Sequence, residues 1–222
     1  MYDLFEDKEF LVRAAPMQHT VPCVGFVVTE KDRPGKLNVD RAMPLVEKNK
    51  EALMALYEDH RRTYRLLKDL KPGQSFAFPD GSSLTAEDVL DPPIEGRKLV
   101  YMGDTCNGDK IAEIAQNATL LIHEATNAWD PADKAKFGSY QRMEYDTLSH
   151  GHSTPQMAGR FARRINAKRV VLTHFSPRYR GDDSEGSMRL MWRLEDMAKL
   201  GADAFWGPND VICAWDQMSL FI

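Results

Sequence analysis

Three short apolar segments of this chain each lead directly into polar, titratable side chains. The segments and the groups after them are residues 98–102 with Asp104, residues 119–122 with His123 and Glu124, and residues 169–173 with His174. Short, continuously apolar strands that alternate with helical patterns are typical of the buried parallel strands of an α/β domain. Binding and catalytic groups of such domains gather beyond the carboxyl ends of the strands. We therefore predict an α/β fold in which these side chains lie at one edge of the sheet.

The remaining elements fit the same fold class. Residues 10–15 and 23–28 are rich in β-branched and aromatic residues, which predicts two further strands. Thr154 followed by Pro155 predicts the start of an amphipathic helix that extends to residue 165. Asp80-Gly81 predicts a tight turn. A hairpin is expected across residues 204–215, where two aromatic segments flank residues 207–210.

Residues 44–70 predict one long amphipathic helix, because their apolar residues recur at three- and four-residue steps. Residues 31–71 hold eleven Lys and Arg against seven Asp and Glu, while the whole chain has a net charge of −4. Such a segment favours a solvated amphipathic helix on charge alone. Contact with a phosphate backbone is the alternative.

Composition narrows the class of protein. The 222 residues include 43% hydrophobic and 28% charged side chains, which excludes a disordered tail and a coiled-coil rod. The three cysteines are widely spaced and form no C-x-x-C pair, so we expect a reducing compartment. No apolar segment is long enough for a membrane span, and residues 1–7 do not resemble a secretory signal. We expect an intracellular protein in the cytoplasm or the nucleus, with an organelle as the alternative location.

Individual candidate residues have alternative interpretations. Asp104 follows a glycine and suits either a metal ligand or a helix N-cap. His152, directly before the predicted helix, is either a proton donor or an ordinary loop histidine. His19 alone is an unremarkable turn histidine. Cys106 has no supporting residues for a nucleophile, and the chain has no P-loop, G-x-G-x-x-G or G-x-S-x-G motif.

Four ordered motifs resemble the C-terminal half of ribonuclease Z, the tRNA 3′-processing endonuclease of the metallo-β-lactamase fold. They are Gly-Asp-Thr at 103–105, Leu-Ile-His-Glu-Ala-Thr at 121–126, Gly-His-Ser-Thr at 151–154 and Leu-Thr-His-Phe-Ser-Pro-Arg-Tyr at 172–179. The similarity extends upstream through residues 15–22, 29–35 and 96–98. It implies an αββα sandwich, of which residues 1–222 would form the C-terminal half, with residues 36–71 as an inserted helical arm.

The resemblance also implies roles for individual residues. His19 and His174 correspond to metal-binding histidines, and Asp104 to the carboxylate that bridges two zinc ions. His152 corresponds to the histidine that protonates the leaving group, and Glu124 supports it. The arm, with Arg61, Arg62 and Arg65, corresponds to the part that grips pre-tRNA, which reverses the preference for a merely solvated helix.

Three features depart from the family pattern. The arm lacks the usual central Gly-Pro pair and shows an uninterrupted helical pattern. Residues 127–149 form a longer segment than is typical, with no assigned role. The H-x-H-x-D-H motif, which supplies most zinc ligands in the family, is absent. Each metal would then receive only two ligands from this chain, whereas a catalytic zinc site takes three from protein.

The expected function is metal-dependent removal of the 3′ trailer of pre-tRNA, with the isolated chain binding zinc weakly and cleaving nothing. The absence of the motif predicts a truncated gene model or, as an alternative, a split enzyme with the N-terminal half on another chain; homodimerisation is what the short-form family suggests. An exposed apolar face should favour aggregation or pairing. Two other functions remain open, a metallo-phosphodiesterase for small esters and a non-catalytic tRNA-binding or partner-stabilising module.

Overall fold

The protein, described here from a computed structural model for residues 1–202, 206–207 and 210–222, divides into two compact units. One unit comprises residues 1–31 and 97–222, and the other comprises residues 32–96. The predicted hairpin across 204–215 falls partly outside the described residues. None of the described helices combines the length and apolar character needed to cross a bilayer.

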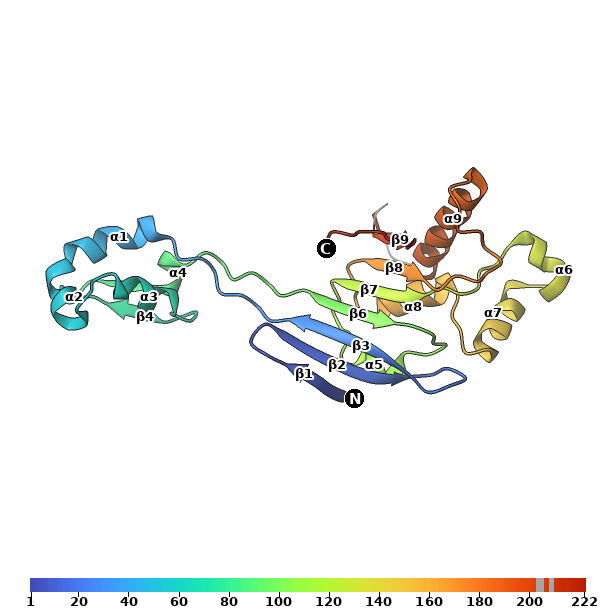
Figure 1. The fold of residues 1–222 in the computed structure, drawn as a ribbon, viewed down its shortest axis with the longest axis horizontal. Coiled ribbons are helices and arrows are strands. Elements are labelled where there is room, and N and C mark those ends of the chain that lie inside the picture. The colour runs from blue at the N-terminus through green and yellow to red at the C-terminus, as the bar shows by residue number, and fades with distance from the viewer. Residues whose placement is uncertain (203–205, 208–209) are drawn as a thin grey trace. The chain divides into compact units, whose positions relative to one another are not determined.

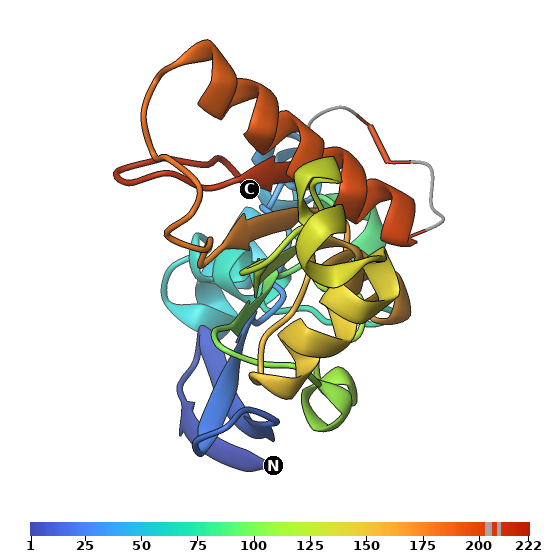
Figure 2. The same cartoon turned by 90° about the vertical axis from the view of Figure 1, so that its right-hand side faces the viewer.

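The first unit is built on a seven-stranded mixed sheet with the order β1-β2-β3-β6-β7-β8-β9 (Figure 1). Its strands are β1 (Tyr2–Glu6), β2 (Phe10–Met17), β3 (Cys23–Glu30), β6 (Lys98–Met102), β7 (Leu120–Glu124), β8 (Val170–Thr173) and β9 (Val211–Cys213). The strands from β1 to β6 pair antiparallel and those from β6 to β9 pair parallel. The N-terminal hairpin lies at one edge of the sheet (Figure 2). The predicted α/β class is confirmed.

Helices cover one face of this sheet. The helical elements of the unit are α5 (Asp109–Ala112), the 3₁₀ turn η1 (Pro131–Asp133), α6 (Lys134–Phe137), α7 (Tyr140–Ser149), α8 (Pro155–Arg164) and α9 (Glu185–Ala202). The core lies between the sheet and α5, α8 and α9. The backbones of α8 and α9 approach closely because Gly159 has no side chain, and a Cβ there would lie 1.9 Å from the Ala198 carbonyl oxygen.

The start of α8 fits its sequence prediction. Thr154 accepts a hydrogen bond from the Met157 amide, and Pro155 is the first helical residue. This cap fixes the chain directly after His152, so it also determines where the histidine emerges.

The opposite face of the sheet keeps apolar side chains at the surface. Val24 and Tyr101 are 45% and 50% exposed, and Phe26 pairs with Tyr101 across β3 and β6. Ile122 and Ile212 continue this row on either side of the buried Val171 and are half-buried. The expected exposed apolar face is therefore present in this unit.

The second unit has its own small core. Its elements are α1 (Val39–Lys48), α2 (Lys50–Tyr57), α3 (Arg62–Lys68), β4 (Ser75–Ala77), β5 (Ser83–Thr85) and α4 (Ala86–Val89). Val46, Leu53 and Leu67 are fully buried in this core. The predicted turn at Asp80-Gly81 joins β4 to β5, with Gly81 at a φ of +85°.

The prediction of one uninterrupted helix over residues 44–70 is wrong, because two breaks divide it. At Asn49 the side-chain amide donates to the Leu45 carbonyl, while its oxygen accepts from the Asp80 amide. At Glu58 the backbone turns to a φ of +65°, and Asp59 then accepts a hydrogen bond from the Arg61 amide. These local side-chain bonds compete with the helix.

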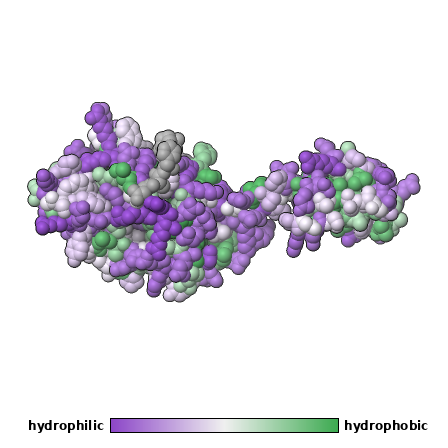
Figure 3. Space-filling model, turned by 180° about the vertical axis from the view of Figure 1, so that it is seen from behind, coloured by the Kyte–Doolittle hydropathy of each residue, from purple (hydrophilic) through white to green (hydrophobic). Residues whose placement is uncertain are grey.

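Apolar residues also reach the surface of the second unit (Figure 3), among them Val39, Met43, Met54 and Leu56. Residues 32–96 as a whole contain ten Lys and Arg and twelve Asp and Glu. The basic character is therefore confined to the helical stretch and is balanced by the hairpin and α4.

Candidate metal centre

Four predicted site residues from separate parts of the chain meet at the carboxyl edge of the parallel strands. His19 follows β2, Asp104 follows β6, His152 precedes α8 and His174 follows β8. The Asp104 carboxylate lies 3.2 Å from His174 Nε2 and 3.8 Å from His19 Nε2. The His152 ring lies between the two other histidines, with ring centroids 4.9 Å from His19 and 5.5 Å from His174.

Asp104 does not cap a helix in this structure. The next helix, α5, begins at Asp109, and its N-cap is Gly108. The carboxylate is one-third exposed and faces the histidines. The N-cap interpretation of Asp104 is therefore wrong.

Positive φ angles at His174 and Gly151 help to bring His174 and His19 to this edge. His174 has a φ of +55°, in the left-handed region, which is costly for a residue with a side chain. Gly151 has a φ of +82°, and a Cβ there would lie 2.4 Å from His19 Nδ1. Gly151, between His150 and His152, thus leaves room for the His19 ring.

Each of the two outer histidines is held through its Nδ1 atom. His19 Nδ1 lies 2.7 Å from the Gly151 carbonyl oxygen, which can only accept, so this nitrogen carries the proton. The Thr126 hydroxyl donates to the Glu124 carboxylate at 2.5 Å, so His174 Nδ1, at 2.8 Å, donates to the Thr126 oxygen. In the neutral form both rings present an Nε2 lone pair, on the side of Asp104.

Glu124 holds His152 in the same way. The carboxylate is fully buried and lies 3.1 Å from His152 Nδ1. It also accepts from the Thr105 amide at 2.6 Å, the Ser153 amide at 3.0 Å and the Thr126 hydroxyl. A buried carboxylate with this many donors is fully satisfied and immobile. His152 Nε2 is left available to the site.

This donor set fits a bound cation. One ligand atom from each of Asp104, His152 and His174 lies within 4.8 Å of the others, and the His174 nitrogen nearest the Asp104 carboxylate is Nε2, at 3.2 Å. A nitrogen lone pair repels a carboxylate oxygen that it faces with no proton between the two atoms. A metal ion bound between them removes that repulsion. Partners on the opposite ring nitrogens are the usual outer-shell support of metal-bound histidines.

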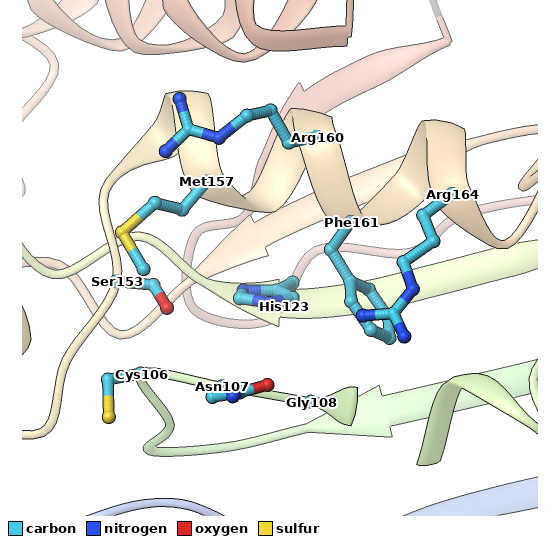
Figure 4. A pocket seen from close by; sticks show the side chains of 9 residues that line it. All are labelled: Cys106, Asn107, Gly108, His123, Ser153, Met157, Arg160, Phe161 and Arg164. Atoms are coloured by element: carbon cyan, nitrogen blue, oxygen red, sulfur yellow. The ribbon is translucent and has the colours of Figure 1, made fainter. Parts of the chain in front are cut away.

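His123, from the same apolar segment as Glu124, is a core residue. It pairs with Met102 and Leu172 in the sheet and points under α8 (Figure 4). Burial lowers its pKa, so the ring is neutral, and its Nδ1 donates to the Glu124 carbonyl at 2.7 Å. A cavity of about 200 Å³ lies beside it, between α8 and Cys106. Burial raises the pKa of the Cys106 thiol, which agrees with the expectation that it is not a nucleophile.

The three predicted RNA-binding arginines belong to the second unit, whereas the metal cluster belongs to the first. Arg61, Arg62 and Arg65 are exposed, at the start of α3 and within it. Arg61 pairs with Asp59 at 3.2 Å.

Two residues of the site were given no role from the sequence. Thr126 links Glu124 to His174, and Gly151 supports His19 through its carbonyl oxygen. The His-Gly-His spacing was the available signal for Gly151, because a glycine between two histidines permits close approach to a third group.

Comparison with known proteins places this geometry in a family. Residues 59–175 match the model of the β-lactamase superfamily domain. The chain is 40% identical over 207 residues, or 90% of its length, to human zinc phosphodiesterase ELAC protein 1, and 38% identical over 176 residues, or 79% of its length, to ribonuclease Z of a Picosynechococcus strain. The crystal structure of the short form of human tRNase Z is similar over 80% of this chain and 41% of that one, with 29% identity and a TM-score of 0.43.

The chain spans about half the length of the curated relatives it matches, 50% of the human protein and 47% of the cyanobacterial one. The matched region includes Asp104, Glu124, His152 and His174. This chain belongs to the β-lactamase superfamily.

Proposed function

We propose that this chain contributes part of the active site of a zinc-dependent endoribonuclease that removes the 3′ trailer of pre-tRNA. The observation that carries the proposal is the convergence of His19, Asp104 and His174 beside the His152–Glu124 pair. The names of its relatives, ribonuclease Z and zinc phosphodiesterase, support the same reaction class and the same metal.

The proposed roles follow from the atoms that each residue presents. His19 and His174 would hold a metal through Nε2, and Asp104 has one carboxylate oxygen on the side of each of them. Zinc held there would activate a water molecule as the nucleophile and would stabilise negative charge on the phosphate. His152, held at Nδ1 by Glu124, gives a proton from Nε2 to the departing 3′-oxygen.

The number of ligands argues for a second polypeptide segment in the working enzyme. His19 and His174 supply one nitrogen each, and Asp104 one oxygen to each side, so each zinc would have two ligands from this chain. A catalytic zinc site takes three from protein and structural sites take four. A single ion could take Asp104, His152 and His174, but His152 would then lose its role as proton donor. The isolated chain should therefore bind zinc weakly and cleave nothing.

The exposed sheet face offers a place for that segment. Val24, Phe26 and Tyr101 form an apolar row on the side of the sheet that α5, α8 and α9 leave uncovered. A polypeptide that packs there buries apolar area and also approaches the strand ends where the metal ligands lie. A second copy of this chain is the alternative occupant.

We propose that residues 36–71 make the contact with the RNA backbone. Arg61, Arg62 and Arg65 are exposed, and phosphate contacts by such side chains give salt-dependent affinity. A non-catalytic RNA-binding module is the second candidate, favoured by the shortage of zinc ligands. A phosphodiesterase for small esters is the third, and it needs no RNA contact.

The test combines the chain with a separately produced polypeptide that carries the H-x-H-x-D-H motif, in the presence of zinc. We expect release of the 3′ trailer from pre-tRNA by the mixture and by neither part alone. The mixture with H152A should lose cleavage but keep RNA binding, whereas E113Q, at an exposed residue outside the site, should behave like wild type. RNA binding without cleavage in every mixture would favour the non-catalytic module. If neutralising the three arginines leaves both the turnover of a model phosphodiester and the cleavage of pre-tRNA unchanged, the small-ester enzyme is favoured.

A further inference from the structure

A polar cavity of about 390 Å³ opens beside His152, on the side of the segment 127–149. His152 forms part of its lining, together with Asp146 from α7, the α7 C-cap His150, Lys136 and Phe137 from α6, and Arg178 after β8. The size is within the range of small-molecule and nucleotide pockets. The segment that had no assigned role therefore builds a large part of a cavity that reaches the proposed proton donor.

The charges in this cavity leave one cation without a carboxylate. Arg178 is held by Asp133 at 2.8 Å and by the Ala128 carbonyl oxygen, so it is a fixed part of the wall. Asp146 faces the His150 ring at 3.9 Å. Within the part of the chain that the structure describes, Lys136 has no ion-pair partner.

A ring lies next to that cation. Lys136 Nζ lies over one face of the half-buried Phe137 ring, 4.5 Å from its centroid, so a base would stack on the other face. An aromatic face for a base and an ammonium group for a phosphate are the two elements that bind single-stranded nucleic acid without base-specific hydrogen bonds. Both belong to α6, a short helix that follows η1 directly and has Gly138 as its C-cap.

We infer that this cavity binds the nucleotide whose 3′-oxygen leaves during cleavage, with its base on Phe137 and its 5′-phosphate on Lys136. The inference rests on the proposed function and adds the position of the substrate. A proton donor must be within hydrogen-bonding reach of the oxygen that it protonates, so the nucleoside carrying that oxygen lies beside His152. Among the described residues, this cavity joins His152 to an aromatic ring and an unpaired cation.

The test uses RNA hairpins that carry 2-aminopurine on one side of the cleavage position. Stacking on an aromatic ring quenches the fluorescence of this base. With the 222-residue chain we expect quenching when the probe lies directly 5′ of the cleavage position. We expect little quenching when the probe lies directly 3′ of it. F137L should remove the quenching and weaken binding about fivefold or more, since a stacked base contributes on this scale. This variant keeps an apolar side chain of similar size, so circular dichroism should be unchanged.

Lys136 has a matched control in Lys134, an exposed lysine of the same helix that does not line the cavity. We expect K136Q to weaken binding and to reduce the salt slope by about 0.7, the value for one phosphate contact on a single strand. K134Q should bind like wild type. RNA binding with equal quenching in F137L and wild type, or equal losses in K136Q and K134Q, would overturn the inference alone. Failure of the wild-type chain to bind RNA would overturn both it and the proposed RNA substrate.

Discussion

His152 Nδ1 lies 3.1 Å from Oε1 of Glu124, a carboxylate that is fully buried and that three other groups also hold. The pair fixes both the tautomer and the direction of the imidazole, because the carboxylate can only accept. This bond leaves Nε2 without a partner on Glu124, and His152 lies in one cluster with Asp104 and His174.

Glu124→Gln should destabilise the protein. The carboxylate accepts from Thr105, Ser153, Thr126 and His152, and an amide replaces one acceptor by a donor that faces other donors. Each buried group left without a partner costs about 1–3 kcal/mol. Urea denaturation should show a loss of this order, and Glu113→Gln, at an exposed site, should show none. Equal stability of both variants would mean that the carboxylate network contributes nothing to the fold.

Gly151→Ala should disturb the site and the fold together. Its φ of +82° costs a residue with a side chain about 1–2 kcal/mol, and the new Cβ would lie 2.4 Å from His19 Nδ1. Thermal unfolding should occur at a lower temperature, and His19 should be displaced from Asp104. Gly186→Ala in α9, where a Cβ meets no atom within 4 Å, should be neutral or stabilising. If both alanine variants melt like wild type, the proposed close approach is wrong.

Stability should fall at acidic pH because of His123. Burial lowers the pKa of this histidine in the folded state, so protons bind preferentially to the unfolded chain. The stabilisation is complete above the unfolded pKa of about 6.5 and decreases below it, by up to about 1.4 kcal/mol per pH unit. Unfolding free energies from pH 5 to 8 should show this slope. His123→Gln should reduce it, whereas His150→Gln, at an exposed site, should not. An unchanged slope in His123→Gln would contradict the assignment.

The uncovered sheet face should make the isolated chain self-associate. Val24 and Tyr101 are each about half exposed on this face, and contiguous apolar surface promotes association. Sedimentation velocity should show a concentration-dependent shift to larger species, and Tyr101→Lys should reduce it. Tyr145→Lys, at a more exposed tyrosine of α7, is the control and should leave it unchanged. A chain that stays monomeric at all concentrations would show that the face needs no partner.

The parallel part of the sheet was predictable because its strands are continuously apolar and are followed by the candidate metal ligands. Asp104 and His174 followed from this pattern and lie where the strands end. The breaks in the helical segment were not predictable from periodicity, because they depend on Asn49 bonding across to Asp80, a contact with a distant residue. The prediction that His123 lies with the other titratable groups at the edge of the sheet was wrong for a related reason. Strand register, and not the end of the apolar segment, places it under α8.

Zinc binding by the isolated chain tests the central claim most directly, since His19, Asp104 and His174 are taken to be real but insufficient metal ligands. Equilibrium dialysis should show weak zinc binding, with a dissociation constant on the order of micromolar or higher, because too few protein ligands are present. Asp104→Asn should abolish this binding, and His150→Gln should leave it unchanged. Tight, sub-micromolar binding by the isolated chain, or binding by Asp104→Asn equal to that of wild type, would contradict the account.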